Sequence, residues 1–173
     1  GAECSARAVH VAVRAELRAN GHPWLVSDLI TLGSPLAHAE LLLATSAADL
    51  RRQIEQRELT TAPPVSDARG AFANPYWYEL PDGSKRTTFV PHHAAWTACV
   101  RWTNLYFPSR WLLLGDAVGG PVAPHFGPGV VDIPVRTRKA GGFLRHTSYW
   151  CLDSRDVHLS NAPVTALRRA LDL

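Results

Sequence analysis

The sequence predicts an α/β fold, a partial and mostly parallel sheet with flanking helices and a hairpin or loop insertion. Short apolar runs at residues 29–32, 100–107 and 130–135 are bounded by Gly, Pro or polar residues, as buried strands are. Helical segments separate the strands, which favours parallel pairing. A hairpin pattern at residues 76–90 interrupts the alternation. We therefore expect a single, partial α/β domain over residues 1–173.

Composition narrows the class of protein. The 173 residues are 46% hydrophobic and 19% charged, which is enough for one globular domain with a real core. No apolar run approaches the ~18 residues of a transmembrane segment, and no secretory signal is visible. Net charge is +3, but the Arg residues are dispersed, so nucleic acid is not an expected partner. Cys4, Cys99 and Cys151 are far apart, which favours ordinary thiols over a zinc site.

The start of the sequence is unusual. The chain begins with Gly1 and contains no Met, which is typical of a partial sequence. We therefore expect a further segment upstream. No targeting signal in the sequence indicates a cellular compartment, so the cytoplasm is the default expectation.

The first half predicts a helix, a strand and a second helix. Residues 5–19 carry an apolar stripe near the 3.6-residue period, and Asn20-Gly21 ends that helix. Residues 29–32 form a short apolar run that Gly33-Ser34-Pro35 closes. Residues 36–58 are amphipathic throughout and predict one long helix.

The middle of the chain predicts an insertion. Residues 60–75 contain several Pro and Gly and no period, so we expect a loop there. Two strands, 76–80 and 85–90, flank Pro81-Asp82-Gly83 and predict a β-hairpin. Residues 60–90 are then either a cap or lid over a site or a structural excursion.

The second half returns to core elements. Residues 92–97 predict a short helix, and the strands at 100–107 and 130–135 follow. The segment 115–129 is rich in Gly and Pro and must be loop. A last helix begins near Ser160 or Asn161 and runs to Leu171, with Pro163 in its first turn.

Candidate chemical groups follow the predicted strands. Ligands of open α/β sheets bind outside the carboxyl ends of the strands, so the loops of Ser34, Asp116 and His146 should open onto one edge. A carboxylate that accepts from an imidazole N–H fixes its tautomer, and a histidine can take and return a proton near neutral pH. The alternative for Asp116 is a turn residue that accepts backbone N–H groups.

Other candidates fit less well. Ser34 lies between Leu32 and Leu36, too crowded for a nucleophile elbow, so it should cap a turn or line a pocket. Asp132 is a second candidate acid, but its alternation with apolar neighbours places it on an exposed strand face. His92 and His93 have no acid or thiol at metal-ligand spacing, so no metal is predicted.

An ordered set of motifs resembles a known family. Leu-Ile-Thr-Leu-Gly-Ser-Pro-Leu at 29–36, Arg-Trp-Thr-Asn-Leu-Tyr-Phe-Pro at 101–108, Gly-Asp-Ala-Val-Gly-Gly-Pro at 115–121 and His-Thr-Ser-Tyr-Trp at 146–150 are similar to the C-terminal half of lipase- or esterase-like α/β-hydrolases. The order acid then histidine also matches the hydrolase order Ser, Asp or Glu, His. The resemblance spans most of residues 25–150.

The resemblance implies a divided active site. It assigns Asp116 as the triad acid and His146 as the base. It also implies a substrate pocket near four further residues, which are Ser34, Gly119, Gly120 and Tyr149. The motif G-x-S-x-G is absent from the 173 residues, so the nucleophilic serine is expected upstream of residue 1.

The expected activity follows from this division. The resemblance implies hydrolysis of a small-molecule or lipid ester without a cofactor, but not by this chain alone, because the nucleophile and part of the oxyanion hole are missing. The alternative function is a non-catalytic binding domain of degenerate hydrolase fold, with Tyr76, Trp77 and Tyr78 as an aromatic surface.

Overall fold

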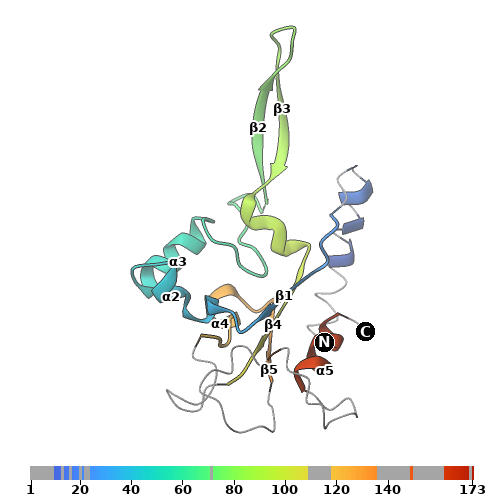
Figure 1. Cartoon of the computed structure of the whole chain (residues 1–173). Helices are drawn as coiled ribbons and strands as arrows, with labels where there is room; N and C mark the ends of the chain where they lie inside the picture. Colours follow the sequence, from blue (N-terminus) through green and yellow to red (C-terminus); the bar gives the residue numbers. More distant parts are fainter. Residues whose placement is uncertain are drawn as a thin grey trace.

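A computed structural model of the chain is shown in Figure 1. It describes the following residues: 10–12, 14–15, 17–19, 21, 24–70, 72–108, 118–135, 149, 162–171 and 173. Within these, no helix is long and apolar enough to cross a membrane.

The centre of the fold is a parallel three-stranded sheet in the order β1-β4-β5. Its strands are β1 (Asp28–Leu32), β4 (Arg101–Tyr106) and β5 (Val130–Pro134). β1 pairs with β4, and β4 pairs with β5, each in parallel register. The three strands expected from the apolar runs are therefore confirmed, and so is the mostly parallel character of the sheet.

The two faces of the sheet carry separate hydrophobic clusters. On one face Trp102 packs against Phe126 of α4 (Ala123–Phe126), with 5.5 Å between the ring centroids. On the other face Leu105 is fully buried in a cluster with Phe107, and residues of α5 (Ala162–Ala170) pack against it. Burial on both faces is typical of parallel sheets. Helical elements therefore cover both faces, as an α/β fold requires. The expectation that residues 115–129 are loop throughout is wrong at α4, whose helical turn ends where the Gly127 N–H donates to the Ala123 carbonyl.

The single long helix expected at residues 36–58 is wrong. The structure has a 3-10 turn η1 (Pro35–His38), a short α2 (Ala39–Leu42) and a separate α3 (Ala47–Glu55). Ser46 is the N-cap of α3, and its Oγ accepts from the Asp49 backbone N–H at 3.1 Å. A side-chain cap satisfies an otherwise unpaired N–H at the start of a helix, which is why α3 begins anew here.

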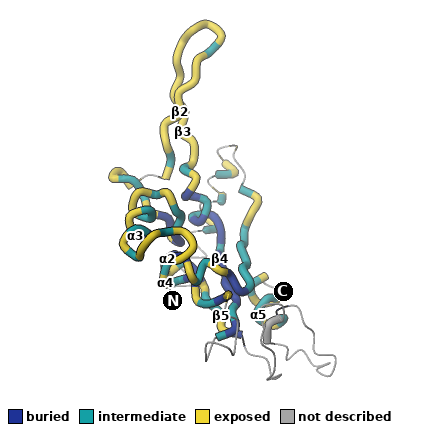
Figure 2. The backbone as a smooth tube through the Cα atoms, turned by 60° about the vertical axis from the view of Figure 1, so that its left-hand side comes forward, coloured by how far each residue is buried: buried dark blue, intermediate teal, exposed yellow. Residues whose placement is uncertain are grey.

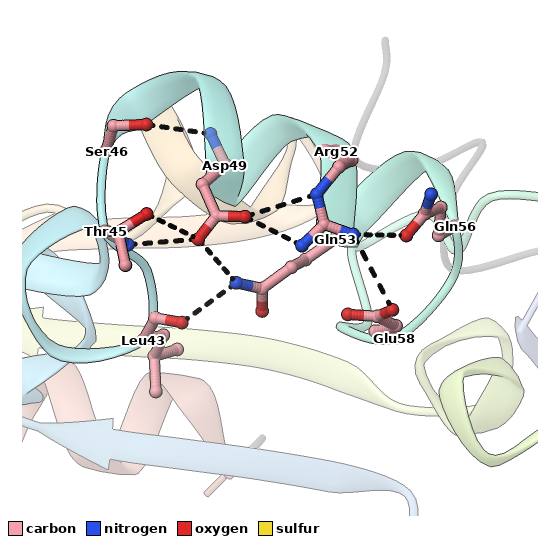
Figure 3. A network of polar contacts seen from close by, with 8 residues as sticks. All are labelled: Leu43, Thr45, Ser46, Asp49, Arg52, Gln53, Gln56 and Glu58. Carbon is pink, nitrogen blue, oxygen red and sulfur yellow. Dashed lines mark hydrogen bonds and ion pairs between the residues drawn. The ribbon is translucent and has the colours of Figure 1, made fainter.

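A polar network surrounds Asp49 at the start of α3 (Figure 3). One carboxylate oxygen accepts from the Thr45 N–H at 3.0 Å and from the Thr45 hydroxyl at 3.1 Å. The other accepts from the Arg52 guanidinium at 2.7 Å. These contacts lower the pKa of Asp49 to about 2, with the Thr45 backbone hydrogen bond as the largest cause.

This network predicts how α3 responds to acid. Because the pKa of Asp49 is lower in the folded state, its contribution to stability is present above the ordinary aspartate pKa and disappears as pH falls toward 2. Carboxyl-detected NMR titration should find Asp49 titrating near pH 2. Arg52→Ala should raise the pKa of Asp49. Arg51→Ala removes an exposed arginine of the same helix and should leave that pKa unchanged. An Asp49 that titrates at its ordinary pKa would contradict the network.

The insertion contains the expected hairpin. Its strands are β2 (Ala73–Glu79) and β3 (Lys85–Pro91), which pair antiparallel. A 3-10 helix η2 (His93–Ala98) follows and leads into the amino end of β4. The His92 backbone N–H donates to the Phe72 carbonyl at 2.7 Å and closes the base of the hairpin. The hairpin and the short helix are confirmed, and both are rooted beside the amino end of β4.

The terminal helices agree with the sequence where they are described. Residues 10–12, 14–15 and 17–19 are helical, and the Gly21 N–H donates to the Arg18 carbonyl with Gly21 at φ 78°. Positive φ at a glycine is a common way for a helix to end. At the other terminus α5 contains Pro163 in its first turn, as expected. Its predicted N-cap, Ser160 or Asn161, lies outside the described residues.

Candidate functional site

The carboxyl ends of the three parallel strands lie at one edge of the sheet. Backbone hydrogen bonds continue past the strand ends: the Gly33 N–H donates to the Leu105 carbonyl, and the Val135 N–H donates to the Tyr106 carbonyl, both at 2.8 Å. The segments that leave β1, β4 and β5 therefore start side by side. In open α/β sheets this edge is where ligands bind.

Ser34 lies in the turn that leaves β1 at this edge. Its side chain is buried, and its Oγ accepts from the Leu36 N–H at 3.3 Å as the N-cap of η1. Gly33 has φ 60°, a backbone conformation that suits glycine at a tight turn. The expectation that Ser34 caps a turn is confirmed.

Gly119 and Gly120 return the chain to the same edge. Gly119 is buried, and the Gly120 carbonyl accepts from Asn104 Nδ2 at 2.9 Å. A Cβ on Gly120 would lie 3.0 Å from the Cβ of Ala37, which belongs to η1. Only a residue without a side chain fits this approach easily. The Gly-Gly segment therefore packs directly against the turn that Ser34 caps.

Tyr149 is anchored at the end of β4. Its ring is buried and lies 4.5 Å from the ring of Phe107, measured between centroids. Its hydroxyl oxygen accepts from the Phe107 N–H at 3.0 Å. These contacts hold Tyr149 at the carboxyl end of the central strand.

The predicted acid and base, Asp116 and His146, lie outside the described residues. Of the predicted pocket residues, the structure brings Ser34, Gly119 and Gly120 together at the strand ends. Tyr149 lies in the core cluster that closes the carboxyl end of β4.

Asp132 was expected on an exposed strand face, and this expectation is wrong. Its carboxylate accepts from Asn104 Nδ2 at 2.7 Å, from the Val122 N–H at 3.0 Å and from the Ala123 N–H at 2.8 Å. The residues that follow the Gly-Gly segment fold back over this face of β5. The side chain is therefore half-buried, and its carboxylate is directed at donors of the protein.

Asp132 belongs to a row of polar side chains across the sheet, which we call the Thr31-Asn104-Asp132 row. These three residues are neighbours in the strand register. The Thr31 hydroxyl donates to Asn104 Oδ1 at 2.9 Å, and Asn104 is fully buried. Buried polar groups of this kind normally have partners, and a satisfied network rigidifies its surroundings. The row fastens the 118–123 segment to the strands just inside the candidate edge.

Tyr106 is a further polar group at this edge that the sequence did not indicate. It is the last residue of β4 and is half-buried. Burial and the negative charge of Asp132 raise the pKa of Tyr106, so its phenol keeps its proton at neutral pH. Its O–H can therefore act as a hydrogen-bond donor at neutral pH.

Alternative reactive groups in the described residues are not activated. Burial raises the pKa of the Cys99 thiol, which keeps it protonated and a weak nucleophile. His92 Nδ1 accepts from the Ala94 N–H at 3.1 Å, so His92 caps η2. No cluster of three or more His, Cys, Asp or Glu that could hold a metal occurs among the residues that the structure describes.

Comparisons of this chain with protein-family models, with curated proteins and with solved structures find no match.

Proposed function

We propose that this chain is the C-terminal part of a serine ester hydrolase and supplies the triad acid, Asp116, and the triad base, His146. The observation that carries the proposal is the arrangement of strand ends. Three parallel strands lie in chain order, and the loops that contain the proposed acid and base leave the carboxyl ends of the second and third strands. This is the edge at which α/β enzymes hold their catalytic groups.

The anchored residues nearby support the assignment. Asp116 is three residues before Gly119, and His146 is three residues before Tyr149. Three residues of chain span at most about 11 Å in any conformation. Gly119 precedes Gly120, whose carbonyl accepts a hydrogen bond from Asn104 of β4. The Tyr149 hydroxyl accepts a hydrogen bond from the Phe107 N–H, just after the end of the same strand. Chain length alone therefore limits Asp116 to within about 11 Å of Gly119 and His146 to within about 11 Å of Tyr149, as the proposal requires.

The proposed reaction is ordinary acyl transfer to serine. A serine from outside these 173 residues attacks the ester carbonyl while His146 takes its proton and then gives it to the leaving alcohol. Asp116 holds the imidazole in the tautomer that accepts this proton. Water then hydrolyses the acyl-enzyme by the same proton transfers. The substrate is a small-molecule or lipid ester, and no cofactor takes part in these steps.

Active-site labelling of the complete gene product tests the proposal. A fluorophosphonate bonds covalently to a serine that a neighbouring base activates, and the labelled peptide can be mapped by mass spectrometry. We expect one labelled serine, within G-x-S-x-G and before the first residue of this chain, and hydrolysis of short p-nitrophenyl esters. Heat-denatured protein is the control and should not react. Labelling at Ser34 would reject the upstream nucleophile, and no labelling together with no ester hydrolysis would reject the enzyme.

A non-catalytic binding domain is the second candidate function. The observation that favours it is the exposed aromatic surface of the hairpin, where Trp77 is 67% exposed and Tyr76 is 56% exposed. The labelling experiment separates the two functions, since a binding domain has no activated serine. The role of residues 60–90 as a cap remains a prediction. Their hairpin is rooted at the amino end of β4, away from the candidate edge.

A further inference from the structure

The hairpin β2–β3 projects from the body of the protein as a bare two-stranded ribbon (Figures 1 and 2). Every residue of β3 is exposed, and so is every residue of β2 except Ala73. Large apolar side chains nevertheless lie along it, with Trp77 at 67% and Phe89 at 64% exposure. Exposed apolar groups concentrated on one element mark an interaction surface.

The ribbon also has unused backbone edges. Among the described residues the sheet consists of β2 and β3 alone, so the outer edge of each strand has no strand beside it. A two-stranded hairpin without further cover is marginally stable in water, and free edges invite pairing with another strand. Pro75 interrupts the outer edge of β2, whereas β3 has no proline from Lys85 to Val90. The edge of β3 is therefore the one open to a partner.

We propose that the partner is a second copy of this chain, and that β3 pairs antiparallel with β3 of that copy about a two-fold axis at Thr87. Such an interface is self-complementary, as two-fold symmetry requires. An axis at Thr87 sets Lys85 opposite Phe89 of the second copy and Gly83 opposite Pro91. The turn of each hairpin thus lies beside the base of the other hairpin. The remainder of each copy lies at opposite ends of the paired hairpins, so the two copies do not collide.

The charges of the hairpin fit this register. Lys85 of one copy meets Phe89 of the other, a pairing in which an ammonium can lie over an aromatic face. Arg86 meets Thr88 of the second copy, whose own cross-strand neighbour is Tyr76. No like charges stand directly opposite each other, and the Arg86 side chains of the two copies lie diagonally across the axis, where they can turn apart into water. Trp77 is the cross-strand neighbour of Thr87 and therefore lies level with the axis on each side.

The same charges disfavour a lipid surface as the partner. Between residues 72 and 92, Glu79 and Asp82 balance Lys85 and Arg86, so the hairpin offers no net positive charge to anionic headgroups. Its tip is polar, because Asp82 accepts from the Ser84 hydroxyl at 2.6 Å. The apolar side chains lie along the shaft, where another strand would cover them.

This association is independent of the proposed hydrolase reaction. The hairpin is rooted beside the amino end of β4, and the candidate site lies at the carboxyl ends of the strands. A dimer formed through β3 leaves that site open.

A charge-pair experiment on the whole chain tests the proposal. In sedimentation velocity, the apparent mass of the wild-type protein should rise from 18.9 kDa at low concentration to twice that mass at high concentration. Thr87→Lys and Thr87→Glu each place like charges opposite each other at the axis and should weaken the dimer about tenfold or more. An equal mixture of the two variants should recover a heterodimer, because the charges then attract.

The control is Ala48→Lys, which adds the same charge at an exposed position of α3 and should dimerise like wild type. Circular dichroism checks that each variant is folded. A wild-type chain that stays monomeric at every concentration overturns the proposal. So does association that Thr87→Lys leaves unchanged, or a monomer that binds phosphatidylcholine vesicles through Trp77.

Discussion

His146→Ala should lower kcat/KM of the complete gene product on a soluble ester by ~10⁴-fold or more, with little change in its unfolding temperature. In the proposed mechanism no other group takes the proton from the serine, so its loss removes base and acid catalysis together. The measurement is hydrolysis of a p-nitrophenyl ester by the purified variant and wild type, alongside thermal unfolding of both.

His93→Ala is the matched control for this variant. His93 is an exposed histidine of η2, at the amino end of β4, and its ring nitrogen contacts only the Glu58 carbonyl at 3.2 Å among the hydrogen bonds of the described residues. It should keep wild-type activity. Asp116→Asn should lower kcat/KM by about 10⁴-fold, because an amide at this position would favour the wrong tautomer of the His146 imidazole.

The outcome that contradicts the assignment is specific. If His146→Ala is folded and keeps more than about a tenth of wild-type kcat/KM, His146 is not the base. If His146→Ala loses activity but also loses its cooperative unfolding transition, the loss reports misfolding and not catalysis. Asp116→Asn then tests the catalytic assignment, because this isosteric change leaves the side-chain volume unchanged.

The strands were predictable from sequence because their signals are local. Each of β1, β4 and β5 is a short segment rich in apolar residues with a breaker close behind it, and Pro81-Asp82-Gly83 marked the hairpin turn in the same way. Segment length and the flanking breakers identified these strands, even though Thr31, Asn104 and Asp132 interrupt their apolar residues.

The prediction of one helix at 36–58 failed because the amphipathic pattern continues across the point where one helix ends and the next begins. The signal was present in Ser46-Ala-Ala-Asp49, a polar N-cap with an acid three residues later. The end of α3 gave no such signal. Arg57 adopts φ 61°, a conformation that glycine usually supplies after a helix. No property of the arginine itself indicates this choice.

The expectation for Asp132 failed for a different reason, because the cover over its side chain comes from a distant segment. Alternation with Val131 and Ile133 predicts a solvated face only if nothing covers that face. The chain from Gly120 to Ala123 does cover it and presents backbone N–H groups to the carboxylate. Contacts of this kind arise from tertiary packing, which a periodicity argument does not contain.

Asp132→Ala should strongly destabilise the fold. It removes the acceptor of the Val122 and Ala123 N–H groups and one of the two acceptors of Asn104 Nδ2. Buried donors left without partners cost about 1–3 kcal/mol each, so we expect the free energy of unfolding to fall by about 2–4 kcal/mol. Urea unfolding followed by tryptophan fluorescence measures this loss.

Two further variants separate the network from the loss of a charge. Asp132→Asn keeps one oxygen acceptor and should lose about half as much stability, because its NH₂ group then faces backbone donors. Asp82→Ala removes an exposed aspartate whose hydrogen bonds to Ser84 lie in the hairpin turn, and it should change stability by less than about 0.5 kcal/mol. Equal losses in all three would mean that the Thr31-Asn104-Asp132 row does not hold the fold.

The same series shows whether the row also positions the candidate edge. Amide hydrogen exchange at Val122 and Ala123 should accelerate in Asp132→Ala well before global unfolding, because the 118–123 segment loses its attachment to β5. In the complete gene product, a loosened Gly119-Gly120 segment should then lower kcat more than it raises KM, since this segment follows the proposed acid by only a few residues. Stability lost without faster local exchange would confine Asp132 to the core, whereas both effects together would make it a positioning residue for the loop of Asp116.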